Sequence, residues 1–360
     1  MSGFSKGKII VEENENEIKS LPIFFPPPIK YSLHGAITSA IILANPNTYE
    51  WYINNFIQIC FDKDYSQNIG EHMFQIYPVH LTRSGKNAAS LVLDDILLSS
   101  DIVNVDRSNI VDSMVKWINK GFYISSVVNV TKFPGTKYYQ NPFRLHGCTC
   151  FGYDLKKNSF KIIDFNEKQI LSIIEVSFEN YINAFFYSND KNFVYQISLR
   201  RVKSNFKYAF DFTMMKRQLY EYLCSKDSGK RDILLYSKDV EWVWGIKVYS
   251  YFVPFVKMCI DKLRMIDIRP FCALHEHKCL MYERIRFLEQ KGILKKRHNL
   301  SEKYLDVVKN ADILKIYILK NEKEIVSTFS TDFIKKQIIH IKQQEKKILK
   351  NVYFYCLFRT

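Results

Sequence analysis

His146 and Asp164 are the residues of this chain whose types and spacing best fit acid–base chemistry. They lie in a stretch, from Gly121 to Asn166, where three apolar, β-branched and aromatic runs are separated by turn-forming residues. This pattern predicts a strand, a long loop and a hairpin. His146 begins the second strand and Asp164 lies near the end of the third, so an antiparallel hairpin turning at Asn158 brings them together. An imidazole beside a carboxylate is the base and orienting group of a nucleophilic site. A purely structural His and Asp remain the alternative.

A candidate nucleophile lies far upstream, at the start of an expected helix. Residues 21–30 hold four prolines and are expected to be extended. The apolar spacing over 37–44 then predicts a helix that ends at Asn45. Ser32 and His34 lie at its start, where unpaired backbone N–H groups and the helix dipole favour a developing negative charge. Serine is also a preferred N-cap, so a structural role for Ser32 stays open.

The charge balance indicates an acidic partner without identifying it. The chain has 360 residues, 47% of them hydrophobic, and its 52 Lys and Arg against 37 Asp and Glu give a formal net charge of +15. Nucleic acid, an acidic carrier protein and a membrane surface all fit that charge. The basic residues form no Arg-rich block or tail, so we do not expect nucleic acid to be the partner.

Composition also bears on the compartment. No apolar stretch reaches transmembrane length, and the first residues lack the apolar core of a signal peptide, so we expect neither a membrane span nor export. The eight cysteines are scattered without CxxC pairs, which favours free thiols over a disulfide framework. We therefore expect a cytoplasmic protein.

The texture of the sequence changes near residue 203. Before it, strand-like and helix-like segments alternate, whereas after it the apolar spacing is helical throughout. We therefore predict an extended leader over 1–29, a mixed α+β domain over 30–203 and an all-helical domain over 204–360.

The helical half contains one compact polar cluster, at residues 267–289. Four potential zinc ligands occur there: Cys272, His275, His277 and Cys279. On a helix, position 277 points away from the other three, and the paired loop ligands of structural zinc sites are missing, so we expect no metal. We expect Arg269, Glu276 and Lys278 to form ion pairs with neighbouring helices or to line a cleft.

The order of these parts resembles the papain-like fold in its bacterial cytoplasmic branch. That branch includes the N-terminal domain of the butirosin biosynthesis protein H family and related proteins from nonribosomal peptide and polyketide gene clusters. The resemblance covers residues 30–360 and implies a papain-like α+β domain with a mostly antiparallel sheet, followed by an all-helical domain. Some relatives carry a D-x-R…EHK…M-x-x-R-I pattern in the helical half, matched here by Asp267, Arg269, Glu276, His277, Lys278, Met281, Arg284 and Ile285.

Members of that family look like peptidases but move an acyl group from a carrier-protein thioester to an amine. By this resemblance, His146 would be the general base and Asp164 its orienting group. The family's nucleophile is a cysteine at the start of the first helix, but residues 28–45 of this chain contain none. The family's cysteine falls best on Ser32. A second register places it on Ala36, which would leave no nucleophile. Cysteines 148 and 150 follow the base on its own strand, away from the line of attack, and rank below the serine.

The resemblance also implies where substrate would bind. Tyr138 and Tyr139, in the long loop after the first strand, would cover the acyl chain, while His34, Arg269 and His277 would contact the substrate. The expected partners are an acidic acyl or peptidyl carrier protein, which bears the acyl group on its phosphopantetheine, and a small amine acceptor, with no cofactor held by the chain itself. Two alternatives stay open: a catalytically inactive papain-like protein that binds a carrier protein or metabolite, and a hydrolase of the thioesterase or peptidase kind.

Overall fold

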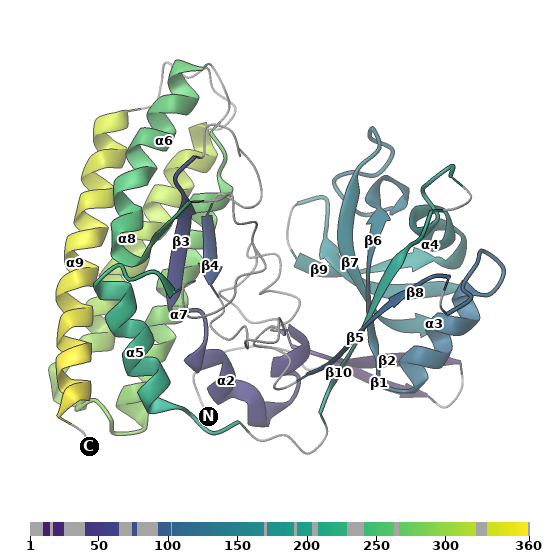
Figure 1. Ribbon diagram of the computed structural model, residues 1–360, viewed down its shortest axis with the longest axis horizontal. Coiled ribbons are helices and arrows are strands. Elements are labelled where there is room, and N and C mark those ends of the chain that lie inside the picture. Colours follow the sequence, from purple (N-terminus) through teal and green to yellow (C-terminus); the bar gives the residue numbers. More distant parts are fainter. Residues whose placement is uncertain are drawn as a thin grey trace. The chain divides into compact units, whose positions relative to one another are not determined.

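The computed structural model divides the chain into two compact units (Figure 1). It describes residues 10–14, 17–24, 40–64, 74–77, 93–101, 103–168, 171–190, 193–203, 208–228, 241–262, 266–321 and 330–358. The described residues up to 48 and those from 93 to 203 form the first unit, called here the sheet unit. Those from 49 to 77 and from 208 to 358 form the second, called here the helical unit. The fold is α+β, as expected, with an antiparallel sheet in the N-terminal half and helices in the C-terminal half.

The sheet unit is built on eight described strands, all paired antiparallel. They are β1 (Ile10–Asn14), β2 (Ile18–Ile23), β5 (Leu93–Ser99), β6 (Tyr123–Asn129), β7 (Leu145–Asp154), β8 (Ser159–Phe165), β9 (Leu171–Ser177) and β10 (Gln196–Val202). Their order is β1-β2-β7-β6-β10-β5, and β8 pairs with both β7 and β9. The predicted strand, long loop and hairpin are therefore β6, residues 130–144, and β7 with β8.

Two helices pack on one face of this sheet, α3 (Ile110–Asn119) and α4 (Phe178–Phe185). Tyr153 and Phe160 pair across β7 and β8 and so point to the same side. The Tyr153 hydroxyl donates to the Asn119 side chain of α3 at 2.9 Å. The Phe160 ring lies against Tyr181 of α4, with centroids 5.1 Å apart. Both helices therefore cover the same face, which carries the unit's aromatic core.

Residues 10–14 and 18–23, expected in an extended leader, form strands β1 and β2 of the sheet. Strand β2 pairs with β7, with Ser20 opposite Gly152. A Cβ on Gly152 would lie 2.6 Å from the Lys19 carbonyl oxygen, so only glycine allows this close approach of the two backbones. Leu21 and Ile23 are buried in the core. The four prolines of residues 21–30 led to the expectation of an extended leader in place of a strand pair.

The helical unit combines long helices with a small sheet. Its helices are α2 (Tyr49–Asn54), α5 (Phe212–Leu223), α6 (Tyr249–Asp261), α7 (Arg269–Gln290), α8 (Leu300–Asn321) and α9 (Thr331–Leu357). Helix α8 packs against α7 and α9, and α9 packs also against α5 and α6 (Figure 1). Among the described residues, no helix has the length and apolar character needed to cross a membrane.

The small sheet corrects two expectations. Strand β3 (Gln58–Asp62) pairs with β4 (Phe74–Tyr77) and with β11 (Trp242–Trp244), so the C-terminal half is not all-helical. Residues 49–77, expected in the first domain, accordingly belong to the helical unit. The physical cause is the apolar character of β3, which is buried along its whole length and whose Phe61 ring packs on Phe252 of α6 at 5.5 Å.

Candidate functional site

The hairpin of β7 and β8 places His146 and Asp164 side by side. Thr149 pairs with Ile163, so continuing the register sets Asp164 diagonally across from His146, on the same face. The turn between the strands contains Asn158 in the left-handed conformation, at φ 50°, which Asn tolerates well. The proximity predicted from the sequence is confirmed: His146 Nδ1 lies 3.3 Å from Asp164 Oδ1.

The surroundings of the pair fix the carboxylate more firmly than the imidazole. The Asp164 side chain is 4% exposed and that of His146 13%. The Phe165 backbone N–H donates to Asp164 Oδ1 at 2.7 Å, and the Phe165 ring lies edge-on to the imidazole at 6.5 Å. A neutral imidazole that donates Nδ1–H to this carboxylate would carry its lone pair on Nε2. This is the tautomer that a general base needs.

The second oxygen of Asp164 is not part of these contacts. Oδ2 is buried and has no hydrogen-bond partner among the described residues. A buried polar atom without a partner carries a desolvation cost, and such atoms concentrate where a ligand, an ion or another group completes a site. Asp164 thus has one oxygen engaged by Phe165 and His146 and one buried oxygen without a partner among the described residues.

A buried polar row continues from Asp164 along the same face. Cys148 lies next to it, and its sulfur is 4.0 Å from the Ser126 hydroxyl, which in turn bonds to Tyr181 at 2.9 Å. Burial, followed by the charge of Asp164, raises the pKa of the Cys148 thiol well above its usual value. Burial likewise raises the pKa of Cys150 to about 12. Both therefore stay protonated and enclosed, which makes them poor nucleophiles.

The loop before His146 is held at its ends. The Asn129 side-chain oxygen accepts from the N–H of Thr131 at 3.3 Å and from the N–H of Arg144 at 3.3 Å. The Arg144 guanidinium lies 4.0 Å from the centre of the Tyr138 ring. Tyr139 is 41% exposed. The structure thus shows Tyr138 engaged within the loop and Tyr139 open to solvent, and an acyl-covering role for either stays a prediction.

Two of the proposed site residues lie outside the described residues. These are Ser32, the candidate nucleophile, and His34, a candidate substrate contact. The described part of the expected first helix begins at Ala40 and is helical through Leu43. Of the expected catalytic residues, the structure thus describes His146 and Asp164.

The two remaining substrate candidates lie in the helical unit, and His277 is fully buried. Its Nε2–H donates to the Ile57 carbonyl at 2.8 Å, and Nδ1 accepts from Lys278 at 2.8 Å. Burial, followed by the charge of Lys278, lowers the pKa of His277 well below its usual value. With no exposed surface and both nitrogens engaged, His277 does not contact substrate, and that expectation is wrong. Arg269 instead bonds to Asp267 at 2.6 Å and stays partly exposed.

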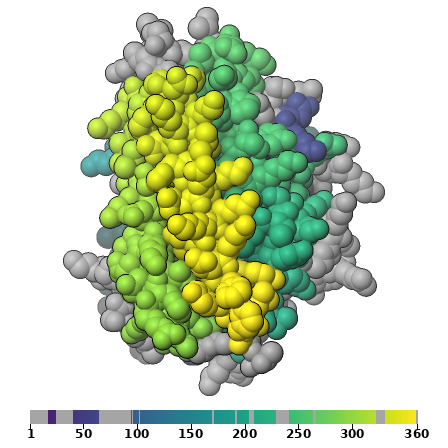
Figure 2. All heavy atoms as spheres, turned by 90° about the vertical axis from the view of Figure 1, so that its left-hand side faces the viewer, coloured from purple at the N-terminus to yellow at the C-terminus, as the bar shows by residue number. Residues whose placement is uncertain are grey.

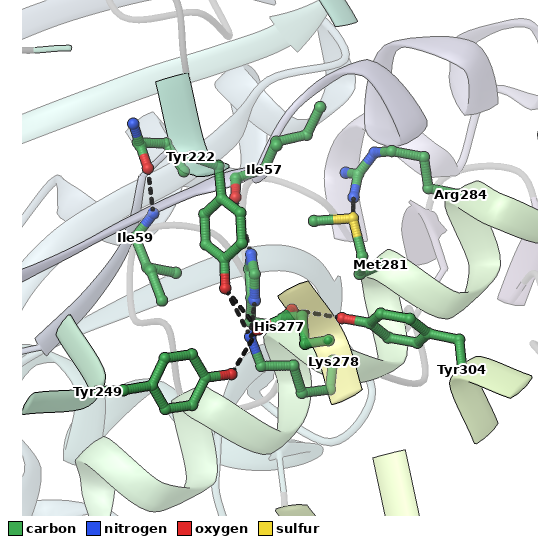
Figure 3. A network of polar contacts seen from close by, with 11 residues as sticks. Ile57, Ile59, Tyr222, Tyr249, His277, Lys278, Met281, Arg284 and Tyr304 are labelled. Atoms are coloured by element: carbon green, nitrogen blue, oxygen red, sulfur yellow. Dashed lines mark hydrogen bonds and ion pairs between the residues drawn. The ribbon is translucent and has the colours of Figure 1, made fainter. Parts of the chain in front are cut away.

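Lys278 lies at the centre of a buried network (Figure 3). Its ammonium contacts both oxygens of Glu345 on α9, at 2.9 and 3.0 Å, and both side chains have no exposed surface. The hydroxyls of Tyr222, Tyr249 and Tyr304 donate to the same carboxylate at 2.7, 2.5 and 2.5 Å. Burial, followed by the charge of Glu345, raises the pKa of all three tyrosines well above the usual value, so they remain donors. The expected ion pair of Lys278 with a neighbouring helix is confirmed.

Arg284 extends the same polar core to the chain around α2. Its Nε donates to the Ile53 carbonyl at 2.7 Å and its Nη2 to the Asn55 carbonyl at 2.6 Å. His277 binds the Ile57 carbonyl in the same way. Two side chains of α7 therefore bind the carbonyls of every second residue from 53 to 57, where α2 ends and β3 begins. Burial lowers the pKa of Arg284, but a guanidinium stays charged in proteins. This part of the pattern in the helical half therefore holds elements together, not substrate.

The cluster that suggested zinc makes contacts within the helical unit. His275 and Cys279 approach to 3.4 Å, and His275 also contacts Lys315 at 3.3 Å. Burial, followed by the charge of Lys315, lowers the pKa of His275 to about 4. Within the part of the chain that the structure describes, no group of three His, Cys, Asp or Glu side chains is arranged to hold a metal ion.

Comparison of the chain with protein-family models finds no match, and comparison with curated proteins finds none either.

Proposed function

We propose that the sheet unit carries an acyl-transfer site in which His146 is the general base and Asp164 its orienting carboxylate. The observation that carries the proposal is the 3.3 Å contact between His146 Nδ1 and Asp164 Oδ1. When a buried carboxylate binds an imidazole through Nδ1, the imidazole can use Nε2 to accept a proton from an incoming hydroxyl or thiol.

The substrate class comes from the papain-like resemblance. The proposed reaction moves an acyl group from the phosphopantetheine thioester of a carrier protein to an amine. Ser32 Oγ would attack the thioester carbonyl while His146 accepts its proton, and His146 would then protonate the departing thiol. The amine would attack the resulting ester, lose a proton to His146, and release the amide as Ser32 regains its proton. The net charge of +15 supports an acidic carrier as the acyl donor, because opposite charge raises the encounter rate.

A second candidate rests on one sequence observation, the lack of cysteine over residues 28–45. A hydroxyl needs activation by a base far more than a thiol does. The alternative is therefore a papain-like protein without catalytic activity that binds a carrier protein or metabolite in an inherited cleft. A third candidate, a thioesterase or peptidase, differs from the first only in that water accepts the acyl group.

The test measures intact-protein mass after incubation with acyl-pantetheine thioesters. The variants are Ser32→Ala, His146→Ala and, as a matched histidine control, His340→Ala on the exposed surface of α9. The proposal predicts an acyl adduct on wild type and on His340→Ala, and none on Ser32→Ala. Removing His146 is expected to slow acylation by about 10²- to 10⁴-fold, the usual contribution of a general base.

The other outcomes separate the candidates. An adduct that persists in Ser32→Ala would move the nucleophile elsewhere in the chain. Product acid instead of amide in the presence of an amine would favour the hydrolase. No adduct and no turnover, together with carrier binding that survives Ser32→Ala, would favour the binding protein. Wild-type turnover in His146→Ala, with the fold intact by circular dichroism, would refute the proposed role of the pair.

A further inference from the structure

Helix α9 has many more basic than acidic side chains on its surface. It carries six lysines, Lys335, Lys336, Lys342, Lys346, Lys347 and Lys350, against two carboxylates, Asp332 and Glu345. Glu345 is buried and paired with Lys278, so Asp332 in the first turn is the only exposed carboxylate of the helix. None of the six lysines has an ion pair with a carboxylate among the described residues. This charge is therefore available to a partner.

The outward stripe becomes apolar at the end of the helix. Positions 346, 347, 350, 354, 357 and 358 follow steps of three and four, opposite the buried stripe of Ile338, Glu345 and Val352. Phe354 is 54% exposed, Leu357 48% and Phe358, just beyond α9, 71%. Figure 2 shows α9, in yellow, along one face of the helical unit between α8 and the helices α5 and α6. The C-terminal surface is defined here as Lys346, Lys347, Lys350, Phe354, Leu357 and Phe358.

More cations lie beside this surface. The rings of His298 and Tyr355 stack with centroids 4.2 Å apart, which brings the connection between α7 and α8 to the end of α9. That connection exposes Lys295, Lys296 and Arg297. Glu302, in the first turn of α8, is an exposed carboxylate of the same region. The net charge of the exposed side chains near the C-terminal surface is therefore strongly positive.

We propose that the C-terminal surface attaches the protein peripherally to an anionic lipid membrane. Exposed Phe and Leu side chains at the end of a helix, beside a row of lysines, match the pattern of interfacial helices. The lysines would lie among anionic headgroups and the three apolar side chains in the boundary with the acyl chains. The inference is independent of the proposed acyl-transfer chemistry.

A nucleic acid fits this surface less well. Reading or stacking of bases uses arginine forks and open aromatic faces in a groove. The described cations of α9 are all lysines, which are compact, strongly hydrated charges. The Tyr355 ring is already stacked on His298, and the Phe354 and Phe358 rings lie edge-to-face at 4.7 Å. An aliphatic Leu357 among them adds nothing to base stacking but suits an acyl boundary.

The test is co-sedimentation of the full chain with vesicles of pure phosphatidylcholine or of phosphatidylcholine with phosphatidylserine. The surface variants are Lys346→Glu/Lys350→Glu and Phe354→Ser/Phe358→Ser. Controls on α8 change exposed lysines and exposed aliphatic residues: Lys309→Glu/Lys320→Glu and Ile313→Ser/Leu319→Ser. Circular dichroism checks that each variant is folded, and the charge variant tests the proposal by itself if the Phe variant fails to fold.

The expected result is sedimentation with anionic vesicles only, weakened by high salt. Each lysine near an anionic surface contributes about a fivefold gain in binding, so the double Lys variant should bind at least about 25-fold more weakly. The α8 controls should bind like wild type. Equal loss in surface and control variants, unchanged binding of the surface variants, equal binding to neutral vesicles, or no sedimentation would each overturn the proposal. In the last case, binding of a single-stranded oligonucleotide that the surface variants lose would assign the surface to nucleic acid.

Discussion

The buried pair of Lys278 and Glu345 predicts two single variants with opposite pH dependence. Lys278→Met leaves a buried carboxylate that still accepts from three tyrosine hydroxyls but has lost its counter-charge. Glu345→Gln leaves a buried ammonium that keeps His277 and Tyr222 as acceptors. Breaking a buried pair by removing one partner costs about 3–5 kcal/mol. Because three hydroxyl donors still stabilise the carboxylate, we expect Lys278→Met to cost about 3 kcal/mol of unfolding free energy.

The sign of the pH effect follows from the charge left behind. In Lys278→Met the unpaired carboxylate gains a raised pKa in the folded state, so its folded form takes up a proton, and the destabilisation shrinks as pH falls from 7 to 5. In Glu345→Gln the unpaired ammonium has a lowered pKa; burial already lowers the pKa of Lys278 in the intact protein. That variant therefore recovers stability as pH rises from 7 to 9.

Guanidinium unfolding followed by tryptophan fluorescence measures both effects. Three of the four tryptophans, Trp51, Trp242 and Trp244, lie in the helical unit and report its unfolding. The double variant Lys278→Met/Glu345→Gln removes both charges and completes the cycle. We expect it to be less destabilised than the sum of the single variants by at least about 2 kcal/mol. Single effects that simply add, or the same pH trend in both variants, would refute the assignment of a charged, coupled pair.

Three further predictions follow from buried groups. His277 has a lowered pKa in the folded state and an ordinary pKa near 6.5 in the unfolded state. Acidification therefore protonates the unfolded chain first, and the free energy of unfolding should fall below pH 6.5 by about 1.4 kcal/mol per pH unit. In urea titrations, His277→Gln should flatten that slope. Arg284→Lys keeps the charge but loses the fork that binds two carbonyls, and we expect it to lower the unfolding free energy by about 2–4 kcal/mol in thermal unfolding; an unchanged midpoint would contradict the clamp. Maleimide should label the exposed Cys224 in the native protein and reach Cys148 and Cys150 only after denaturation, as read by mass spectrometry; native labelling of either buried thiol would show that the sheet opens there.

Local pattern was sufficient to predict the hairpin and the proximity of His146 and Asp164. The alternation of β-branched and aromatic residues, the turn at Asn158, and the period of two along each strand together determined that His146 and Asp164 share a face. The same local rules predicted the helical spacing after residue 208. These features depend on neighbours a few residues apart, which a sequence displays directly.

Contacts between distant segments were decided only by the tertiary structure. Residues 49–77 belong to the helical unit because β3 finds its partner β11 in a strand some 180 positions away, a pairing that local spacing does not encode. Glu345 drew no notice in the sequence because its role exists only where α9 meets Lys278 and three tyrosines from other elements. The expectation that His277 contacts substrate is wrong for the same reason. A histidine in a polar segment is expected to be accessible, but packing buries this one against the Ile57 carbonyl. The sequence by itself determined which side chains could do chemistry, and burial, which depends on the whole chain, decided which of them can meet a substrate.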